Sequence, residues 1–76
     1  MQTALIVSDP EIMLGKPVVV GTRITVELIL ELLGAGETNQ QILDEYPQLT
    51  DESIRAALQF ASREMKAVAI YPNSAA

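Results

Sequence analysis

A run of three valines between two glycine-containing segments constrains this chain more than any other feature. Val18 to Val20 are preceded by Gly15-Lys16-Pro17 and followed by Gly21-Thr22. β-branched residues favour strands, whereas proline cannot donate a ladder hydrogen bond and belongs at the start or edge of a strand. Residues 3–7 predict a second short strand. We therefore expect residues 1–24 to form an extended β segment, with its two strands paired as a hairpin or across a dimer.

The residues that bound the valine run have the character of a structural motif. Glycine permits positive φ and close backbone approach, so both glycines predict tight turns. The two bases of the segment can each balance a neighbouring acid. We therefore expect a structural role for Gly15, Lys16, Pro17, Gly21, Thr22 and Arg23.

The remainder of the chain predicts three helices. The first runs from about Thr25 to Ala35, and the second from Thr38 to Tyr46, each with a threonine as N-cap. Gln41 completes a capping box with Thr38. The third begins after Thr50 and extends to about Lys66. The expected fold is mainly α, with a β segment at 1–24, a three-helix body at 25–67, and a C-terminal tail at 68–76 that contains a possible short strand at 68–72.

The first helix is apolar around most of its circumference. Its polar stripe consists of Glu27 and Glu31 alone, which indicates burial on more than one side and favours a second chain as cover. Leu28 and Leu32 are expected on the side opposite the core face, and we take them as candidate interface residues, together with Tyr71 of the tail. The expected core face consists of Val26, Ile29, Leu30 and Leu33.

The third helix shows three separate arcs on a helical wheel. The core stripe is expected to contain Ile54, Ala57, Leu58, Ala61 and Met65. Phe60 lies outside this stripe and is either a core residue at its margin or an anchor for a protein partner. The polar arc holds Arg55, Gln59, Ser62, Arg63 and Lys66, which is either a solvated face or a DNA-binding one formed by Arg55, Gln59, Arg63 and Lys66.

Composition excludes several classes of function. The 76 residues contain no cysteine and no histidine, which removes disulfides, thiolate zinc sites and imidazole chemistry. The acids lie on predicted exposed helix faces rather than in a pocket, so we expect no enzyme, cofactor or small-molecule substrate. No apolar run is long enough for a membrane span, and no signal peptide is recognisable, so the expected location is the cytoplasm.

The charge is unevenly distributed. The net charge is −5, and seven acids but no base lie between Arg23 and Arg55. Such a chain repels phosphate overall, so it suits a basic protein partner better than a nucleic acid. The alternative is that these acids are solvated helix faces.

The stretch from Leu14 to Leu33 (LGKPVVVGTRITVELILELL), with Ala35-Gly36, the segment from Ile42 to Pro47, and Leu49-Thr50, resembles a prokaryotic family. It is a domain family of unknown function, number four hundred and thirty-three, with the hallmark GKPVIRGTRI. The resemblance covers about residues 5–65. It implies a homeodomain-like or winged-helix-like, helix-turn-helix body. It also implies an antitoxin of a type II toxin–antitoxin pair, which dimerises, binds a PIN-like ribonuclease toxin and represses its own operon through operator DNA.

The sequence departs from the family pattern at two positions. Val19 or Val20 stands where the family often has arginine, and Thr25 where it often has proline. The missing base removes one potential phosphate contact, so the segment is expected to be architectural. The main hypothesis is an antitoxin that binds its toxin. The alternative is a dimeric helix-turn-helix transcriptional regulator without a toxin partner.

Overall fold

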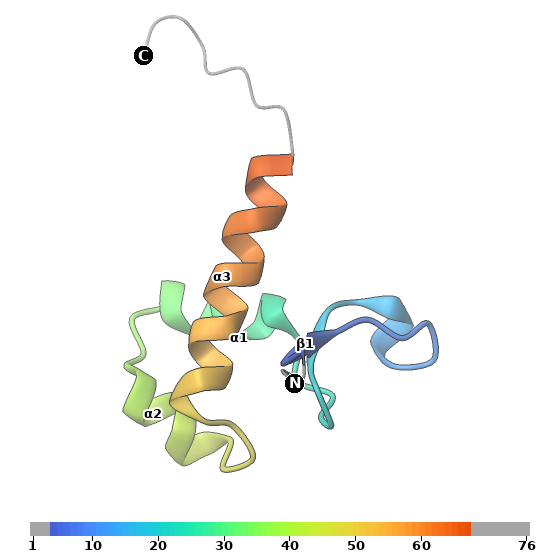
Figure 1. Ribbon diagram of the computed structural model, residues 1–76. Coiled ribbons are helices and arrows are strands. Elements are labelled where there is room, and N and C mark those ends of the chain that lie inside the picture. The colour runs from blue at the N-terminus through green and yellow to red at the C-terminus, as the bar shows by residue number, and fades with distance from the viewer. Residues whose placement is uncertain (1–3, 68–76) are drawn as a thin grey trace, which may run out of the picture.

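The computed structural model describes residues 4–67 and shows three helices joined to a small β hairpin (Figure 1). The chain is mainly α with a short antiparallel β segment near its N-terminus, which confirms the expected fold class. In chain order the elements are β1 (Ile6–Val7), the 3-10 turn η1 (Met13–Gly15), β2 (Val18–Val19), α1 (Val26–Gly34), α2 (Asn39–Glu45) and α3 (Asp51–Ala67). The expected strand at 68–72 and the candidate residue Tyr71 lie outside the described residues.

The valine run becomes the central segment of the β region. β1 pairs antiparallel with β2, with Ile6 opposite Val19 and Val7 opposite Val18. On the other side of β2, the chain that follows the turn returns alongside it: the Val19 amide donates to the Ile24 carbonyl at 2.9 Å, and the Val26 amide donates to the Pro17 carbonyl at 2.9 Å. The strands therefore pair as a hairpin, and both are shorter than the expected runs.

Three threonines begin the three helices. Thr25 Oγ1 accepts a hydrogen bond from the Leu28 amide at 3.0 Å. Thr38 and Gln41 form the expected capping box, with amide-to-side-chain distances of 2.8 and 3.1 Å. Thr50 Oγ1 accepts from the Ser53 amide at 3.1 Å. These caps satisfy amides that have no partner within their helix, so the helix starts are fixed locally.

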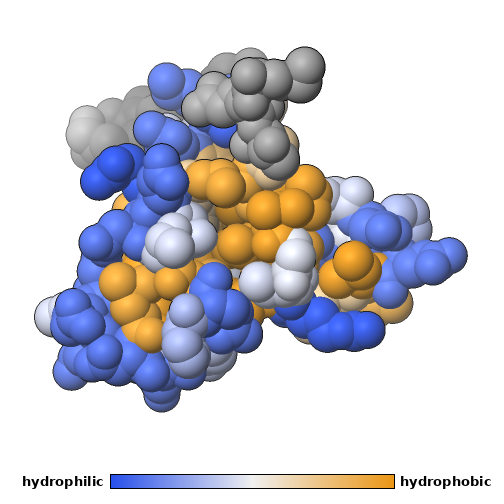
Figure 2. Space-filling model, turned by 60° about the horizontal axis from the view of Figure 1, so that its bottom comes forward, coloured by the Kyte–Doolittle hydropathy of each residue, from blue (hydrophilic) through white to orange (hydrophobic). Residues whose placement is uncertain are grey.

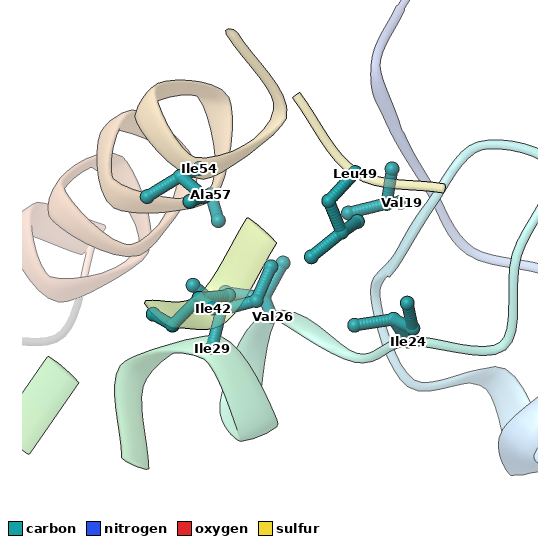
Figure 3. Close-up of a cluster of buried hydrophobic side chains, with 8 residues drawn as sticks. All are labelled: Val19, Ile24, Val26, Ile29, Ile42, Leu49, Ile54 and Ala57. Carbon is teal, nitrogen blue, oxygen red and sulfur yellow. The ribbon is translucent and has the colours of Figure 1, made fainter. Parts of the chain in front are cut away.

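The core lies where the three helices meet the hairpin (Figure 3). Each helix contributes one isoleucine that is completely buried: Ile29 from α1, Ile42 from α2 and Ile54 from α3. Val19 and Ile24 extend the same cluster into the β region, so the hairpin and the helices share a single core. The remaining members of the cluster are Val26, Leu49 and Ala57.

The core face of α1 differs from the expected one. Leu28 and Leu32 are half-buried and pack against the core, whereas Leu30 is 36% exposed. Ile29 is the centre of one broad face on which Leu28 and Leu32 form one flank. Leu30 joins Glu27 and Glu31 on the outer side. The assignment of Leu28 and Leu32 to a face opposite the core is wrong, because a wheel gives the angles between side chains but not which angle points at α2 and α3.

The expected stripe of α3 is only partly buried. Ile54 and Ala57 are fully buried and Ala61 half-buried, but Leu58 is 45% exposed and Met65 60% exposed. The C-terminal half of α3 extends beyond the other two helices (Figure 1). Met65 lies two turns past Ala57, where the body no longer covers the stripe. The face shown in Figure 2 also has apolar surface in its middle, surrounded by hydrophilic residues.

Candidate protein-docking groove

A hollow of about 530 Å³ lies between the first half of α1 and the second half of α3. Its apolar residues come from three parts of the chain: Pro17 before β2, Val26 and Leu30 of α1, and Phe60, Ala61 and Met65 of α3. Three carboxylates also line it: Glu27, Glu31 and Glu64. We call this feature the α1/α3 groove.

The groove forms where the C-terminal half of α3 extends beyond the other helices and separates from α1. Leu30 lies on the outer side of α1, and Met65 lies on the projecting half of α3. Phe60 is half-buried and packs against the core below them. Contiguous exposed apolar surface bordered by charges is typical of a site of protein–protein interaction.

The border of the groove is negatively charged. Lys16 Nζ and Glu27 Oε1 form an exposed ion pair at 2.9 Å. The hydrogen bond to Glu27, followed by the charges of Glu27 and Glu31, raises the pKa of Lys16 above its ordinary value. No other ion pair is present within residues 4–67, so neither Glu31 nor Glu64 is paired with a base there. The groove therefore presents an apolar floor and a net negative border.

The candidate DNA-binding residues lie along one exposed side of α3. Arg55, Gln59, Arg63 and Lys66 are all exposed. Gln59 and Arg63 line a second hollow, of about 320 Å³, together with residues 4–6 around β1 and with Ala56 and Phe60. The first turn of α3 carries Asp51 and Glu52, both exposed. The polar arc is therefore brought together as the wheel predicts, but its N-terminal end is acidic.

The candidate interface residues are dispersed. Leu28 and Leu32 pack against the core, and Phe60 lines both hollows. Leu30 and Met65 are groove residues that the sequence pattern did not indicate, because on a helical wheel both fall on the expected core faces. A usable signal was present, since Leu30 follows Glu27 by three residues and precedes Glu31 by one, which places it near the polar stripe of α1.

The motif around the valine run has the expected backbone geometry. Gly15 and Gly21 have φ values of +84° and +77°. Thr22 Oγ1 donates to the Val19 carbonyl at 2.8 Å and accepts from the Ile24 amide at 3.0 Å, which closes the turn. Pro17 lines the α1/α3 groove, and Lys16 pairs with Glu27 at the border of that groove. Arg23 is exposed and lines a third hollow.

Met13 and Leu14 add an unexpected feature to this segment. Both have positive φ, at +50° and +59°, which is uncommon for residues that carry a Cβ. Leu14 is 93% exposed. Two hydrogen bonds within the turn stabilise this strained backbone conformation. The Gly15 amide donates to the Ile12 carbonyl, and the Lys16 amide donates to the Met13 carbonyl.

Within residues 4–67, no group of three or more acidic side chains is arranged to hold a metal ion. The same residues contain no helix with the length and hydropathy that a membrane span requires.

The fold and the groove together define a small, mainly helical domain with a β hairpin and one wide apolar groove. The chain belongs to the family described as "Protein of unknown function (DUF433)", whose model matches residues 6–61. It is 37% identical over 57 residues to an uncharacterized protein of Sinorhizobium fredii, a match that covers 75% of this chain and 26% of that protein.

A solved structure shares the fold. The crystal structure of a member of the same family from Anabaena variabilis superposes with a TM-score of 0.80 at 25% sequence identity, and the match covers 86% of this chain and 64% of that one. The chain therefore spans about a quarter of the rhizobial protein and somewhat under two thirds of the cyanobacterial one.

Proposed function

We propose that this chain is the antitoxin of a type II toxin–antitoxin pair and that it neutralises a PIN-like ribonuclease by binding it directly. The observation that supports this proposal is the α1/α3 groove, whose apolar floor is bordered by Glu27, Glu31 and Glu64. An apolar groove bordered by one sign of charge selects a partner that carries apolar anchors and the opposite charge.

A ribonuclease is a partner of that chemistry. It has to hold RNA phosphates, so the surface around its active site is basic. A chain with a net charge of −5 is attracted to such a surface over a long range. Occupying that surface excludes RNA from the enzyme without any chemistry from the antitoxin. The groove has the charge and apolar character required for this mode of inhibition.

The test is co-expression of the full chain with the product of the adjacent gene. The neighbour alone is expected to arrest growth, and the pair to grow and to elute as one complex in size exclusion. Leu30→Arg places a charge on the groove floor and should abolish both rescue and complex. Leu58→Arg is the matched control, since Leu58 is similarly exposed but does not line the groove, and it should retain both.

Either of two results would refute the proposal. One is a neighbour that is harmless alone and forms no complex with the chain. The other is a complex that Leu30→Arg and Leu58→Arg weaken equally, because binding would then not use the groove. Circular dichroism of both variants establishes that each is folded.

A second candidate function is that of a dimeric helix-turn-helix regulator that binds operator DNA. The observation that favours it is the exposed arc of Arg55, Gln59, Arg63 and Lys66 on α3. Asp51 and Glu52 oppose it, because recognition helices commonly meet the bases with their N-terminal residues. The two functions are compatible, since the arc and the α1/α3 groove occupy different sides of α3.

DNA binding has its own test. A gel shift on the chain's own promoter should weaken as salt rises, because phosphate contacts release counterions. Replacing Arg55 and Arg63 by glutamate should abolish the shift. An unchanged shift in that variant would exclude the arc as the DNA-binding surface, and no shift with the unaltered chain would exclude this function at that promoter.

A further inference from the structure

Five of the six apolar residues that line the α1/α3 groove offer an occupant no free backbone group. Pro17 has no amide, and its carbonyl accepts a hydrogen bond from the Val26 amide at 2.9 Å. Leu30, Phe60 and Ala61 lie inside α1 and α3, where the amide and the carbonyl of each residue are bonded to neighbouring turns of the same helix. The carbonyl of Val26 is bonded within α1 in the same way. Binding on this floor therefore relies on side chains.

This backbone arrangement decides which kind of segment can lie on the floor. An extended segment carries unpaired amides and carbonyls, and those turned toward the floor would lose water without gaining a partner, which costs free energy. An α-helix has already bonded its own backbone and presents only side chains. The groove therefore favours a helix over a strand, and the apolar residues of the bound segment must recur at helical spacing.

The length of the groove limits the contact to about one and a half turns of such a helix. Its lining spans residues 26–31 on α1 and residues 60–65 on α3. At about 1.5 Å per residue each wall is about 7.5 Å long, compared with a helical pitch of about 5.4 Å. Apolar residues at positions i, i+3 and i+4 of a bound helix fill that length and lie on one face. Leu30 and Met65, on opposite walls, have exposed surface that can contact them.

Two carboxylates on opposite walls determine the charge of the bound segment. Glu31 of α1 and Glu64 of α3 line the groove, and neither is paired with a base within residues 4–67, whereas Glu27 pairs with Lys16. Positions i−1 and i+1 of a helix lie about 100° to either side of position i, so bases at these positions flank the apolar face. Lysine and arginine can lay their apolar stems along the floor and place their charges at the two carboxylates.

We propose that the α1/α3 groove binds one amphipathic helix of the partner protein, with apolar residues at i, i+3 and i+4 and with lysine or arginine on both flanks of that face. This inference rests on the proposed function, because it takes the groove as the protein-binding site. It adds the secondary structure and the residue pattern of the segment that binds there.

Charge opposes the two occupants that this chain itself could supply. Residues 68–76 contain no lysine and no arginine, so they cannot pair with Glu31 or Glu64. A second copy of the chain has the same net charge of −5, and like charges repel. A basic helix of a different protein complements both the apolar floor and the carboxylates of the groove.

The test is selection from a displayed library of random peptides of about 16 residues, long enough for a helix of several turns. The full chain is the target and Leu30→Arg is the counter-target, which removes peptides that bind other surfaces. Enriched sequences are expected to carry apolar residues three and four apart, with lysine or arginine on both flanks. A synthetic copy of a selected peptide should gain helical circular dichroism on binding, and a proline in the middle of its apolar face should weaken binding about tenfold or more.

A second substitution tests the apolar floor from the opposite wall. Met65→Arg should lower the affinity of the selected peptide about tenfold or more, because it places a base where the peptide carries its own. Leu58→Arg is the matched control, since Leu58 is exposed on the same helix but does not line the groove, and it should leave the affinity unchanged. Circular dichroism establishes that each variant is folded.

A charge reversal tests the two carboxylates. Glu31→Lys/Glu64→Lys should lower the affinity of the selected peptide about tenfold or more and should reduce its dependence on salt. Glu11→Lys/Glu45→Lys makes the same change in net charge at two exposed acids that do not line the groove, and it should lower the affinity far less.

The proposal is overturned if no peptide enriches against the full chain over Leu30→Arg, or if the enriched peptides alternate apolar and polar residues or carry acids in place of bases. It is also overturned if peptides enrich only against Ile70→Asp/Tyr71→Asp, which would assign the groove to residues 68–76. A lower sedimentation mass of Leu30→Arg than of the unaltered chain would assign the groove to a second copy and would equally overturn it.

These outcomes are distinguishable from failure of the antitoxin proposal, because the peptide selection does not use the neighbouring gene product. A chain that selects basic helical peptides but has a harmless neighbour retains this inference and loses the antitoxin function. A chain that neutralises its neighbour through Leu30 but selects no such peptide loses this inference alone.

Discussion

The burial of Ile54 and the exposure of Leu58 give a quantitative test of the fold. Both residues belong to one predicted stripe of α3 and lie one turn apart. Ile54 is completely buried, whereas Leu58 is 45% exposed. Replacing either by alanine deletes three carbon groups, so the chemistry of the two substitutions is matched and only the environment differs.

The expected magnitudes follow from the burial. Three deleted groups at about 0.8 kcal/mol each give about 2.4 kcal/mol for Ile54→Ala, and the cavity left beside Ile29 and Ile42 brings the loss to about 3 kcal/mol. At Leu58 about half of the side chain is already in water and no closed cavity forms, so we expect about 1 kcal/mol. A domain of 76 residues is stable by about 4–11 kcal/mol, so Ile54→Ala removes a large fraction of the total.

The assay is urea unfolding followed by far-ultraviolet circular dichroism, at one fixed protein concentration because association stabilises the folded state. A shift of the midpoint at unchanged slope gives the difference in the free energy of unfolding. Equal losses for the two variants would refute the assignment of Ile54 to the core and Leu58 to the surface. A larger loss for Leu58→Ala would contradict both the burial of Ile54 and the exposure of Leu58.

Three further predictions concern the helix caps, the turns and the acids. Thr38→Ala removes the capping box of α2 and should lower stability by about 1 kcal/mol, seen as a fall of about 4–8 °C in the melting temperature; no change would mean that the cap is not formed in solution. Gly21→Ala should destabilise the chain by about 1 kcal/mol, because φ is +77° at this position, even though no atom lies close to the new Cβ. Gly34 lies in a helix and has equally open space around it, so Gly34→Ala should be neutral or stabilising in the same denaturation assay. Desolvation, with smaller contributions from the charge of Glu45 and a hydrogen bond with it, raises the pKa of Glu37 in the folded state. Its stabilising contribution is therefore present below the pKa of an unfolded glutamate and lost as pH rises through the folded pKa, and a carboxyl titration by NMR that finds Glu37 at or below that unfolded value would contradict this.

The sequence was informative wherever the physical cause is local. Thr25, Thr38 and Thr50 mark the three helix starts because a side-chain oxygen beside a free amide acts within a few residues. The turn at Gly21 was recognisable for the same reason, since positive φ is a property of single residues. The family was also recognisable, because most of the residues that resemble it form one continuous stretch, and the family model matches residues 6–61.

The candidate site was far less predictable. Leu30 and Met65 are 35 residues apart and meet across the α1/α3 groove only because α1 crosses α3 near the point where α3 leaves the body. The helical wheel placed Leu28 and Leu32 on the side of α1 expected to contact a partner, but both side chains pack against the core. The angle at which the two helices cross depends on packing among Ile29, Ile42 and Ile54 rather than on any local pattern.

The sequence by itself therefore determined the elements, their caps and the turn that follows the valine run, because backbone preferences and hydrogen-bonding side chains act over a few residues. The sequence also determined the net negative charge and the absence of histidine and cysteine. Only the tertiary structure decided which apolar residues are core and which are surface. That choice depends on which sides of α1 and α3 face each other, and this is set by contacts between residues distant in the chain.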